Sequence, residues 1–414
     1  MNCAVHITIQ FTMRSIKSLP WGENMENTLF KIGKRQVTDK MAVTMLVVSL
    51  FLPYFVSIAA LVVVFFALLF NKRARSIALD GKATMLLYIF TALSVLASVF
   101  GGNWLGILCT VGIFAVLTVG QFMLKVVDKD AVDNVIKGIS KVLPFVTLFT
   151  VGEFCVRFYF VELAHQKIRF MTRCVSFFFN PNYLGAVMAT TTLIYIYLFL
   201  KHKEKRGKYL ACGLMSLVCL VLSQSLLSCL GLLVGAAVLL AVSKQWGWLG
   251  LYAALLGAVV LAVVLFPQYI PRLDEITETF TLRLRIWRVA LEGFKESVLF
   301  GQGPLTYFHI CGDYVGKIPG VDVWNTQHAH NIIFDSLLNY GIVGAMFLWS
   351  YLGCFVVKIF GRLKGGDAFI KGLVISVLCA VLLHGMLDVT VLWVQTGILF
   401  LFALMMWTEK EKEK

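Results

Sequence analysis

The sequence predicts an all-α, polytopic membrane protein, and two observations carry that prediction. Of its 414 residues, 59% are apolar by type and only 14% are charged, with a mean hydropathy of +0.82; soluble globular proteins have about 45–50% apolar and about 25% charged residues. Several uninterrupted apolar runs also reach the roughly 20 residues that a helix needs to cross a bilayer. These observations exclude a soluble enzyme, a nucleic-acid-binding module and a disordered protein.

Apolar runs alternate with polar segments along most of the chain. They cover residues 42–70, 83–100, 104–124, 142–160, 183–200, 209–222, 225–242, 246–266, 332–360, 372–387 and 391–407. Pro53 lies near the middle of the first run, where a helix breaks or kinks. We therefore expect two short helices or a re-entrant pair there, and a single long tilted helix is the alternative.

Basic residues between the runs orient the bundle. The clearest cytoplasmic segment is 201–208 (KHKEKRGK), because loops rich in Lys and Arg stay on the cytoplasmic side. Counting outward places 31–40, 71–75, 125–141, 358–371 and 409–414 on the same side. This predicts about twelve transmembrane helices with both termini cytoplasmic. The expected divisions are a tail (1–40), the bundle (41–266), one large extracytoplasmic loop (267–331), the rest of the bundle (332–407) and a tail (408–414).

The outer loops, 161–182 and 267–331, contain cations that the orientation rule does not explain. The chain has 37 Lys and Arg against 23 Asp and Glu, a net charge of +14. Most cations of the inner loops are Lys, whereas most of the outer ones are Arg, whose planar guanidinium suits bidentate phosphate binding. The alternative is that they pair with neighbouring Asp and Glu in a solvated network.

One outer segment, 281–298 (TLRLRIWRVALEGFKESV), predicts an amphipathic helix on the membrane surface or across the bundle. At 100° per residue, Trp287, Leu291, Phe294 and Val298 fall within 80° of Arg283. Arg283 therefore lies on the apolar face, where an unpaired charge is costly. It requires an anionic partner, either from the protein core or from a substrate.

Histidines also concentrate in the outer loops, where His328 and His330 precede the run that starts at residue 332. A neutral His near arginines suits a general base, although a merely hydrogen-bonded His is the alternative. A zinc site would recruit His309 and Asp313 as well. Because no HExxH or comparable spacing is present, we expect neither a metal nor another cofactor.

Three further features are weaker. The turn at 300–304 (FGQGP) brings backbone N–H groups close together, as an anion site requires. Glu153 and Arg157 have the i,i+4 spacing of an ion pair on a helix. Cys174 and Cys311 are the only cysteines of the outer loops described above, and a disulfide between them is an open alternative.

In this order the motifs resemble the O-antigen ligase and polymerase superfamily of bacterial membrane glycosyltransferases. The resemblance rests on 283–287 (RLRIW), 300–303 (FGQG), 330–331 (HN) and 340–344 (YGIVG). The sequence FNPN at 179–182 and the His384/Asp388 pair look like further family features. The motifs that carry the resemblance lie within about residues 179–344. The order of helices and loops resembles that of the family over most of the chain.

The resemblance implies a metal-independent, inverting enzyme of the bacterial inner membrane with an extracytoplasmic active site. Its partners would be an undecaprenyl-pyrophosphate-linked glycan as donor, a lipid, glycan or protein acceptor, and membrane lipids. The family's essential His corresponds to His330 and its loop Arg to Arg283. The expected substrate-binding residues are Arg169, Arg173, Arg285, Trp287, Arg288, Gly301, Gly303, His328 and Asn331.

The chain departs from the family pattern at two positions. Leu282 replaces the Gly that usually precedes the loop Arg, and Leu226 replaces a second Arg that often follows a Ser. Either Arg169 or Arg173 takes over the second role, or this chain uses fewer cations. A transporter or flippase of lipid-linked oligosaccharides is the alternative function, but it predicts charged residues at mid-membrane and internal repeats, neither of which the sequence favours.

Overall fold

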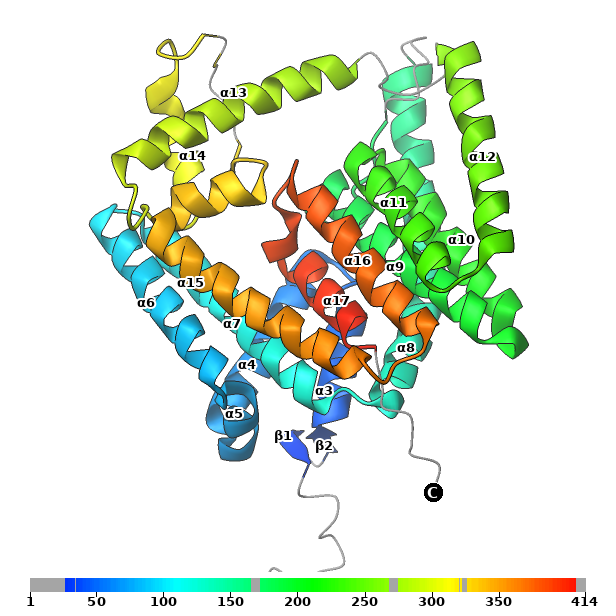
Figure 1. Ribbon diagram of the computed structural model, residues 1–414, viewed down its shortest axis with the longest axis horizontal. Helices are drawn as coiled ribbons and strands as arrows, with labels where there is room; N and C mark the ends of the chain where they lie inside the picture. The colour runs from blue at the N-terminus through cyan, green and yellow to red at the C-terminus, as the bar shows by residue number, and fades with distance from the viewer. Residues whose placement is uncertain are drawn as a thin grey trace, which may run out of the picture.

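The computed structural model describes residues 27–33, 35–164, 172–267, 275–319, 321 and 326–406, which form an almost entirely helical body (Figure 1). An antiparallel hairpin of β1 (Thr28–Ile32) and β2 (Arg35–Thr38) comes first. The first helices are α3 (Asp39–Ser49), α4 (Tyr54–Phe70), α5 (Lys72–Leu79), α6 (Lys82–Phe100), α7 (Trp104–Val126), α8 (Lys129–Arg157) with its π-helical extension η1 (Phe158–Leu163), α9 (Pro181–Lys201), η2 (Lys203–Lys205) and α10 (Arg206–Ser223). They are followed by α11 (Leu226–Val242), α12 (Trp246–Leu265), α13 (Glu275–Glu296), α14 (Thr306–Ile310), η4 (Cys311–Tyr314), α15 (Ile332–Leu363), α16 (Ala368–Gly385), η5 (Thr390–Leu392) and α17 (Val394–Leu404). The all-α prediction is confirmed.

Eight helices of the described residues are long and apolar enough to cross a membrane. They are α6, α7, α8 with η1, α9, η2 with α10, α12, α15 and α16. A ninth span results if α4 and α5, bent by 103° at Asn71, are counted together, and α11 and α17 are apolar but shorter. The chain is thus a multi-pass helical protein, whereas the count of twelve crossings stays a prediction.

The first apolar run is broken, as Pro53 predicts. Helix α3 ends at Ser49, and α4 begins directly after Pro53. The break leaves carbonyl groups without helical partners, and α17 satisfies two of them: Nε2 of Gln395 donates to the carbonyls of Leu50 (2.9 Å) and Leu52 (3.3 Å). The alternative of one continuous helix is therefore wrong.

The basic segments predicted to share one side of the membrane are joined by ion pairs. Arg73 pairs with Asp39 (2.8 Å), and Lys201 pairs with Asp367 (3.2 Å). Lys40 lies between Asp128 and Asp130 at the start of α8. In Figure 1 the β-hairpin and α5 lie at the lower end of the bundle, and α13 crosses its upper end. Which end faces the cytoplasm stays a prediction.

Helix α13 confirms the predicted amphipathic helix but corrects its buried face. The buried residues are Ile286, Val289, Ala290 and Gly293, whereas Leu291 and Val298 of the expected apolar arc are exposed. The buried face is rotated because α13 packs on α14 and on the start of α15. Arg283 lies one turn before Ile286 on this face.

Helix α15 changes direction at Gly341, which divides it into two parts. Gly341 has a φ of +62°, and a Cβ there would overlap the backbone of Leu299. The amides of Ile342 and Val343 donate to the carbonyls of Val298 and Leu299 instead of to their own helix. The first part of α15 therefore lies across the end of the bundle below α13 (Figure 1), and it begins at the site described next.

Candidate active site

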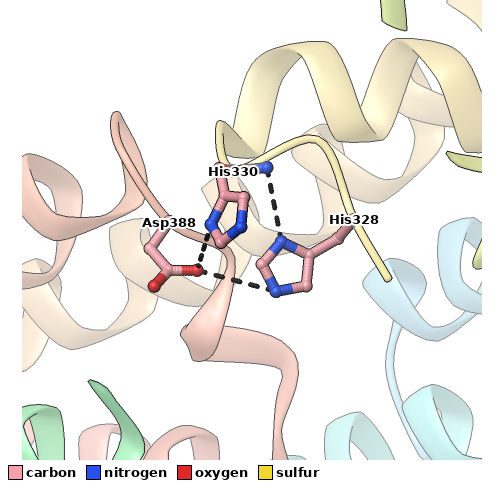
Figure 2. A group of neighbouring side chains, drawn as sticks. All are labelled: His328, His330 and Asp388. Atoms are coloured by element: carbon pink, nitrogen blue, oxygen red, sulfur yellow. Dashed lines mark hydrogen bonds and ion pairs between the residues drawn. The ribbon is translucent and has the colours of Figure 1, made fainter. Parts of the chain in front are cut away.

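Two turns that are far apart in the sequence meet below α13. His328 and His330 lie just before α15, and Asp388 lies just after α16. Nδ1 of His330 is 3.2 Å from Oδ1 of Asp388, and Nε2 of His328 is 3.6 Å from the same oxygen. Figure 2 shows both rings turned toward the carboxylate. The three side chains form what we call the His–Asp cluster.

The backbone of the histidine turn is held by residues at the start of α15. Asn331 caps that helix, because its Oδ1 accepts from the amides of Ile333 (2.9 Å) and Phe334 (3.1 Å). Its Nδ2 donates to the carbonyl of Met386 (2.8 Å), which joins the turn to the end of α16. Asp335 accepts from the amide of Ala329 (2.9 Å). These bonds hold His330 at a φ of +49°, a conformation uncommon for residues other than Gly.

Asp388 is buried, with only 2% of its side chain exposed, yet it is fully hydrogen-bonded. Its Oδ2 accepts from Nδ2 of Asn182 (2.8 Å), and its Oδ1 accepts from the amide of Val389 (2.8 Å). Burial alone raises the pKa of Asp388, but the hydrogen bond and the electrostatic interaction with His330 outweigh it and hold the pKa well below its usual range. The carboxylate is therefore charged at neutral pH.

His328 is neutral. Burial lowers its pKa to about 4, against the attraction of Asp388. Its Nδ1 accepts from the amide of His330 (3.3 Å), so its single proton is on Nε2, which faces Asp388. We assign a proton to Nδ1 of His330 as well, because a carboxylate can only accept the hydrogen bond between them. The lone pair of Nε2 of His330 then remains available to accept a proton.

Arg173 reaches the cluster through Asn182. Its Nη2 donates to Oδ1 of Asn182 (2.8 Å), and its Nε donates to the carbonyl of Ser223 (3.2 Å) at the end of α10. Asn182 is the second residue of α9, directly after Pro181, and Asn180 caps that helix. The helix start therefore places Asn182 between the guanidinium and Asp388.

Arg283 extends from α13 to the opposite side of the same turn. Its Nε donates to the carbonyl of Leu387 (2.9 Å), the residue before Asp388. The predicted need for a partner is met in part by this carbonyl and by the carbonyl of Thr279, which accepts from Nη1 of Arg283 (3.4 Å). The guanidinium of Arg283 also borders an open space.

That space is a pocket of about 410 Å³ between α9, α11 and α13. Its polar side consists of Arg173, Asn182, Thr279, Arg283 and His330. Its apolar wall is formed by Leu226, Leu227 and Leu230 of α11 and by Ile276, Phe280, Leu282 and Ile286 of α13. Two guanidiniums, an imidazole and an apolar wall in one pocket suit an anion attached to a lipid.

Two of the predicted cations, Arg173 and Arg283, line this pocket. Arg173 and Leu226, the position of the missing family Arg, line it together, whereas Arg169 lies outside the described residues. Arg285 and Arg288 are not among the pocket-lining residues of the described part of the chain. Trp287 packs between Phe280 and Phe334, so its described contacts are those of a core residue.

The two glycines predicted to bind substrate pack against backbone and a neighbouring helix. Gly301 and Gly303 both have positive φ. A Cβ at Gly301 would overlap the carbonyl of Asn339, and one at Gly303 would overlap Ser98 of α6. Nδ2 of Asn103 donates to the carbonyl of Pro304 in the same turn (2.7 Å). The turn thus joins α13 to α6, α7 and α15. This close packing explains why glycine occupies both positions.

The zinc alternative named His309 and Asp313, which are exposed and do not belong to the His–Asp cluster. The cluster itself offers three ligand atoms within 4.8 Å of one another. Glu153 and Arg157 form the predicted ion pair (2.8 Å), and Cys174 and Cys311 are both free thiols.

Asp388 and Asn182 are the site residues that were not predicted from the sequence. Both belong to segments noted as family features, and Asp388 was noted there together with His384. In the structure His384 instead has its Nδ1 3.2 Å from the hydroxyl of Thr390. The turn between α16 and η5 directs Asp388 toward His330.

Fold and site together define a multi-pass helical membrane protein with an acid–base cluster and two arginines at one end of the bundle. The family model described as O-antigen ligase matches residues 210–349, from α10 into α15. The match includes Arg283 and His330 and confirms the resemblance to the O-antigen ligase and polymerase superfamily. It supports, in broad terms, a membrane protein that transfers glycans. No curated protein matches the chain.

Proposed function

We propose that the protein is a glycosyltransferase that moves a glycan from undecaprenyl pyrophosphate to an acceptor hydroxyl in cell-surface polysaccharide biosynthesis. One observation carries the proposal: Arg173, Arg283 and His330 line the same pocket, beside an apolar wall. The arginines suit a pyrophosphate, the apolar wall suits an isoprenoid, and His330 suits the activation of a hydroxyl.

The reaction needs no group beyond these side chains. Nε2 of His330 takes the proton of the acceptor hydroxyl as its oxygen attacks the anomeric carbon. The bond from that carbon to the phosphate oxygen breaks, and the oxygen leaves with the electron pair as polyprenyl pyrophosphate. Arg283 and Arg173 stabilise the negative charge of the leaving group, and Asp388 stabilises the imidazolium of His330. Attack opposite the leaving group inverts the anomeric configuration.

The test is a transfer reaction with purified protein in detergent micelles. The donor is an undecaprenyl-pyrophosphate-linked oligosaccharide, and the acceptors are the same lipid-linked oligosaccharide or a lipid A core, each in a separate reaction. Micelles have no second compartment, so glycan transfer there measures an enzyme and not a transporter. We expect product with one of the two acceptors and in the presence of EDTA. Intact donor in both reactions, with a folded protein, contradicts the proposal.

His330→Gln is the matched variant for the same reaction, because glutamine keeps a polar side chain but cannot act as a base at neutral pH. We expect it to lose transfer while still binding undecaprenyl pyrophosphate. His309→Gln changes an exposed histidine outside the pocket and serves as the control. Equal transfer by His330→Gln and wild type contradicts the role of His330.

A further inference from the structure

Asn182 contacts both halves of the site. Its Oδ1 accepts from Nη2 of Arg173 (2.8 Å), and its Nδ2 donates to Oδ2 of Asp388 (2.8 Å). Asp388 in turn lies 3.2 Å from Nδ1 of His330. A hydrogen-bonded series thus runs from the guanidinium in the pocket to the imidazole in the same pocket.

The two neighbours fix the orientation of the Asn182 amide. A guanidinium only donates hydrogen bonds, and a carboxylate only accepts them. The reversed amide would place its NH₂ against Arg173 and its oxygen against Asp388, losing both bonds and setting like partial charges together. Both contacts therefore favour the same orientation, and each one supports the other.

The Asn182 amide also determines which oxygen of Asp388 forms the hydrogen bond with His330. Asn182 occupies Oδ2, so Oδ1 faces the imidazole. With Nδ1 of His330 directed at Oδ1, the opposite nitrogen Nε2 is directed away from the carboxylate. The direction in which Nε2 of His330 points therefore depends on Asn182, which also contacts Arg173, the proposed pyrophosphate-binding residue.

We propose that Asn182 is a positioning residue: it fixes the orientation of Asp388, and through Asp388 that of His330, relative to Arg173. This inference rests on the proposed transfer reaction, because it assigns Arg173 to the donor and His330 to the acceptor. It predicts that loss of the Asn182 amide acts on turnover more than on donor affinity. It also predicts that Arg173 affects turnover as well as donor affinity, because Arg173 orients the amide.

Three variants separate positioning from folding. Asn182→Leu has nearly the same size and removes both hydrogen bonds. Asn182→Asp keeps size and the oxygen that faces Arg173 but offers no N–H to Asp388, and it is the second variant if the leucine protein does not fold. Asn180→Asp is the matched control: it adds the same charge two residues away and keeps the cap of α9, because Asp and Asn cap helices equally well.

Kinetics give the first readout. Asn182→Leu should lower kcat by about 10- to 100-fold, the range typical for residues that orient a functional ligand, with donor KM within about threefold. Asn180→Asp should change neither constant by more than about twofold. A rise of donor KM in Asn182→Leu with unchanged kcat overturns the inference.

The second readout does not depend on transfer. In protein labelled with ¹⁵N-histidine and reconstituted in nanodiscs, the hydrogen-bonded Nδ1–H resonance of His330 is assigned by its loss in His330→Gln. We expect this resonance to move in Asn182→Leu and Asn182→Asp and to stay in place in Asn180→Asp. An unchanged resonance in both Asn182 variants overturns the inference, even if kcat falls. If wild type transfers no glycan, the proposed function fails, whereas the resonance still decides whether Asn182 positions His330.

Discussion

Nδ1 of His330 and Oδ1 of Asp388 lie 3.2 Å apart, although 58 positions separate the two residues in the sequence. The contact joins the start of α15 to the end of α16, and the bond from Asn331 to the carbonyl of Met386 holds the same two ends together. A carboxylate in this position fixes the tautomer of a histidine and stabilises its protonated form. The pair is the centre of the proposed mechanism.

Removing the charge of Asp388 should therefore affect turnover strongly. We expect Asp388→Asn to lower kcat by about three to four orders of magnitude, because the amide offers the wrong partner to Nδ1–H of His330. The measurement is transfer under saturating donor, with thermal unfolding of each protein recorded alongside. Asp313→Asn changes an exposed carboxylate and is the control. A loss of less than about tenfold in Asp388→Asn contradicts the pairing.

The donor-binding role of Arg173, though not its bond to Asn182, should be replaceable from across the pocket. Removing its charged hydrogen bonds in Arg173→Ala should weaken donor binding by about 10- to 100-fold. Leu226 lines the same pocket, and 42% of its side chain is exposed, so an arginine fits there. Leu226→Arg in the Arg173→Ala protein should restore most of the donor affinity, measured as donor KM or as binding of undecaprenyl pyrophosphate.

Arg288→Ala is the matched control for the same series, because Arg288 belongs to α13 but is exposed and lies outside the pocket lining. We expect its donor KM to equal that of wild type within about twofold. Similar losses in Arg173→Ala and Arg288→Ala would show that surface charge, and not the pocket, attracts the donor.

His328 should make stability depend on pH. Its pKa is lowered to about 4 in the folded protein, mainly by burial, against an ordinary value of 6.5. The unfolded chain therefore binds a proton between these values while the folded chain does not, so stability is lost as pH falls from about 6.5 toward 4. The loss from His328 between pH 7 and pH 5 should be about 2 kcal/mol.

The measurement is the difference in free energy of unfolding between pH 7 and pH 5, taken in the same micelles. His328→Gln should reduce that difference, whereas His309→Gln should leave it unchanged because His309 is exposed. A difference that is the same in wild type and His328→Gln contradicts a buried, neutral His328.

Two Gly→Ala variants should have opposite effects on stability. A Cβ at Gly303 would overlap Ser98, and its φ of +91° disfavours any other residue, so Gly303→Ala should cost about 1–3 kcal/mol. Gly361 lies in α15 with no atom near its missing Cβ, so Gly361→Ala should stabilise by about 0.5–1 kcal/mol. Thermal unfolding measures both, and a stable Gly303→Ala protein would contradict the packing of the turn.

Local features of the fold were predictable because their causes are local. Hydropathy and Pro53 predicted the helices and the break between α3 and α4. Periodicity predicted α13 and the position of Arg283, but not the rotation of its buried face. That rotation depends on α14 and the first part of α15, which reach α13 only through the turn and the kink at Gly341.

The site was predictable only in part, because its partners come from distant segments. His330, Arg283 and Arg173 were predicted, and they line one pocket. Asp388 and Asn182 were not predicted as site residues, since Asp388 contacts His330 and Asn182 from 58 and 206 positions away in the sequence. The structure adds that Arg173 and Leu226, the position of the family's second arginine, line the same pocket, whereas Arg169 lies outside the described residues.

The most direct test of the central claim is the rate of glycan transfer by purified wild type and His330→Gln, with an undecaprenyl-pyrophosphate-linked oligosaccharide as donor. The account predicts steady product formation by wild type and none by His330→Gln, while both proteins bind undecaprenyl pyrophosphate equally. Transfer at the wild-type rate by His330→Gln would contradict it.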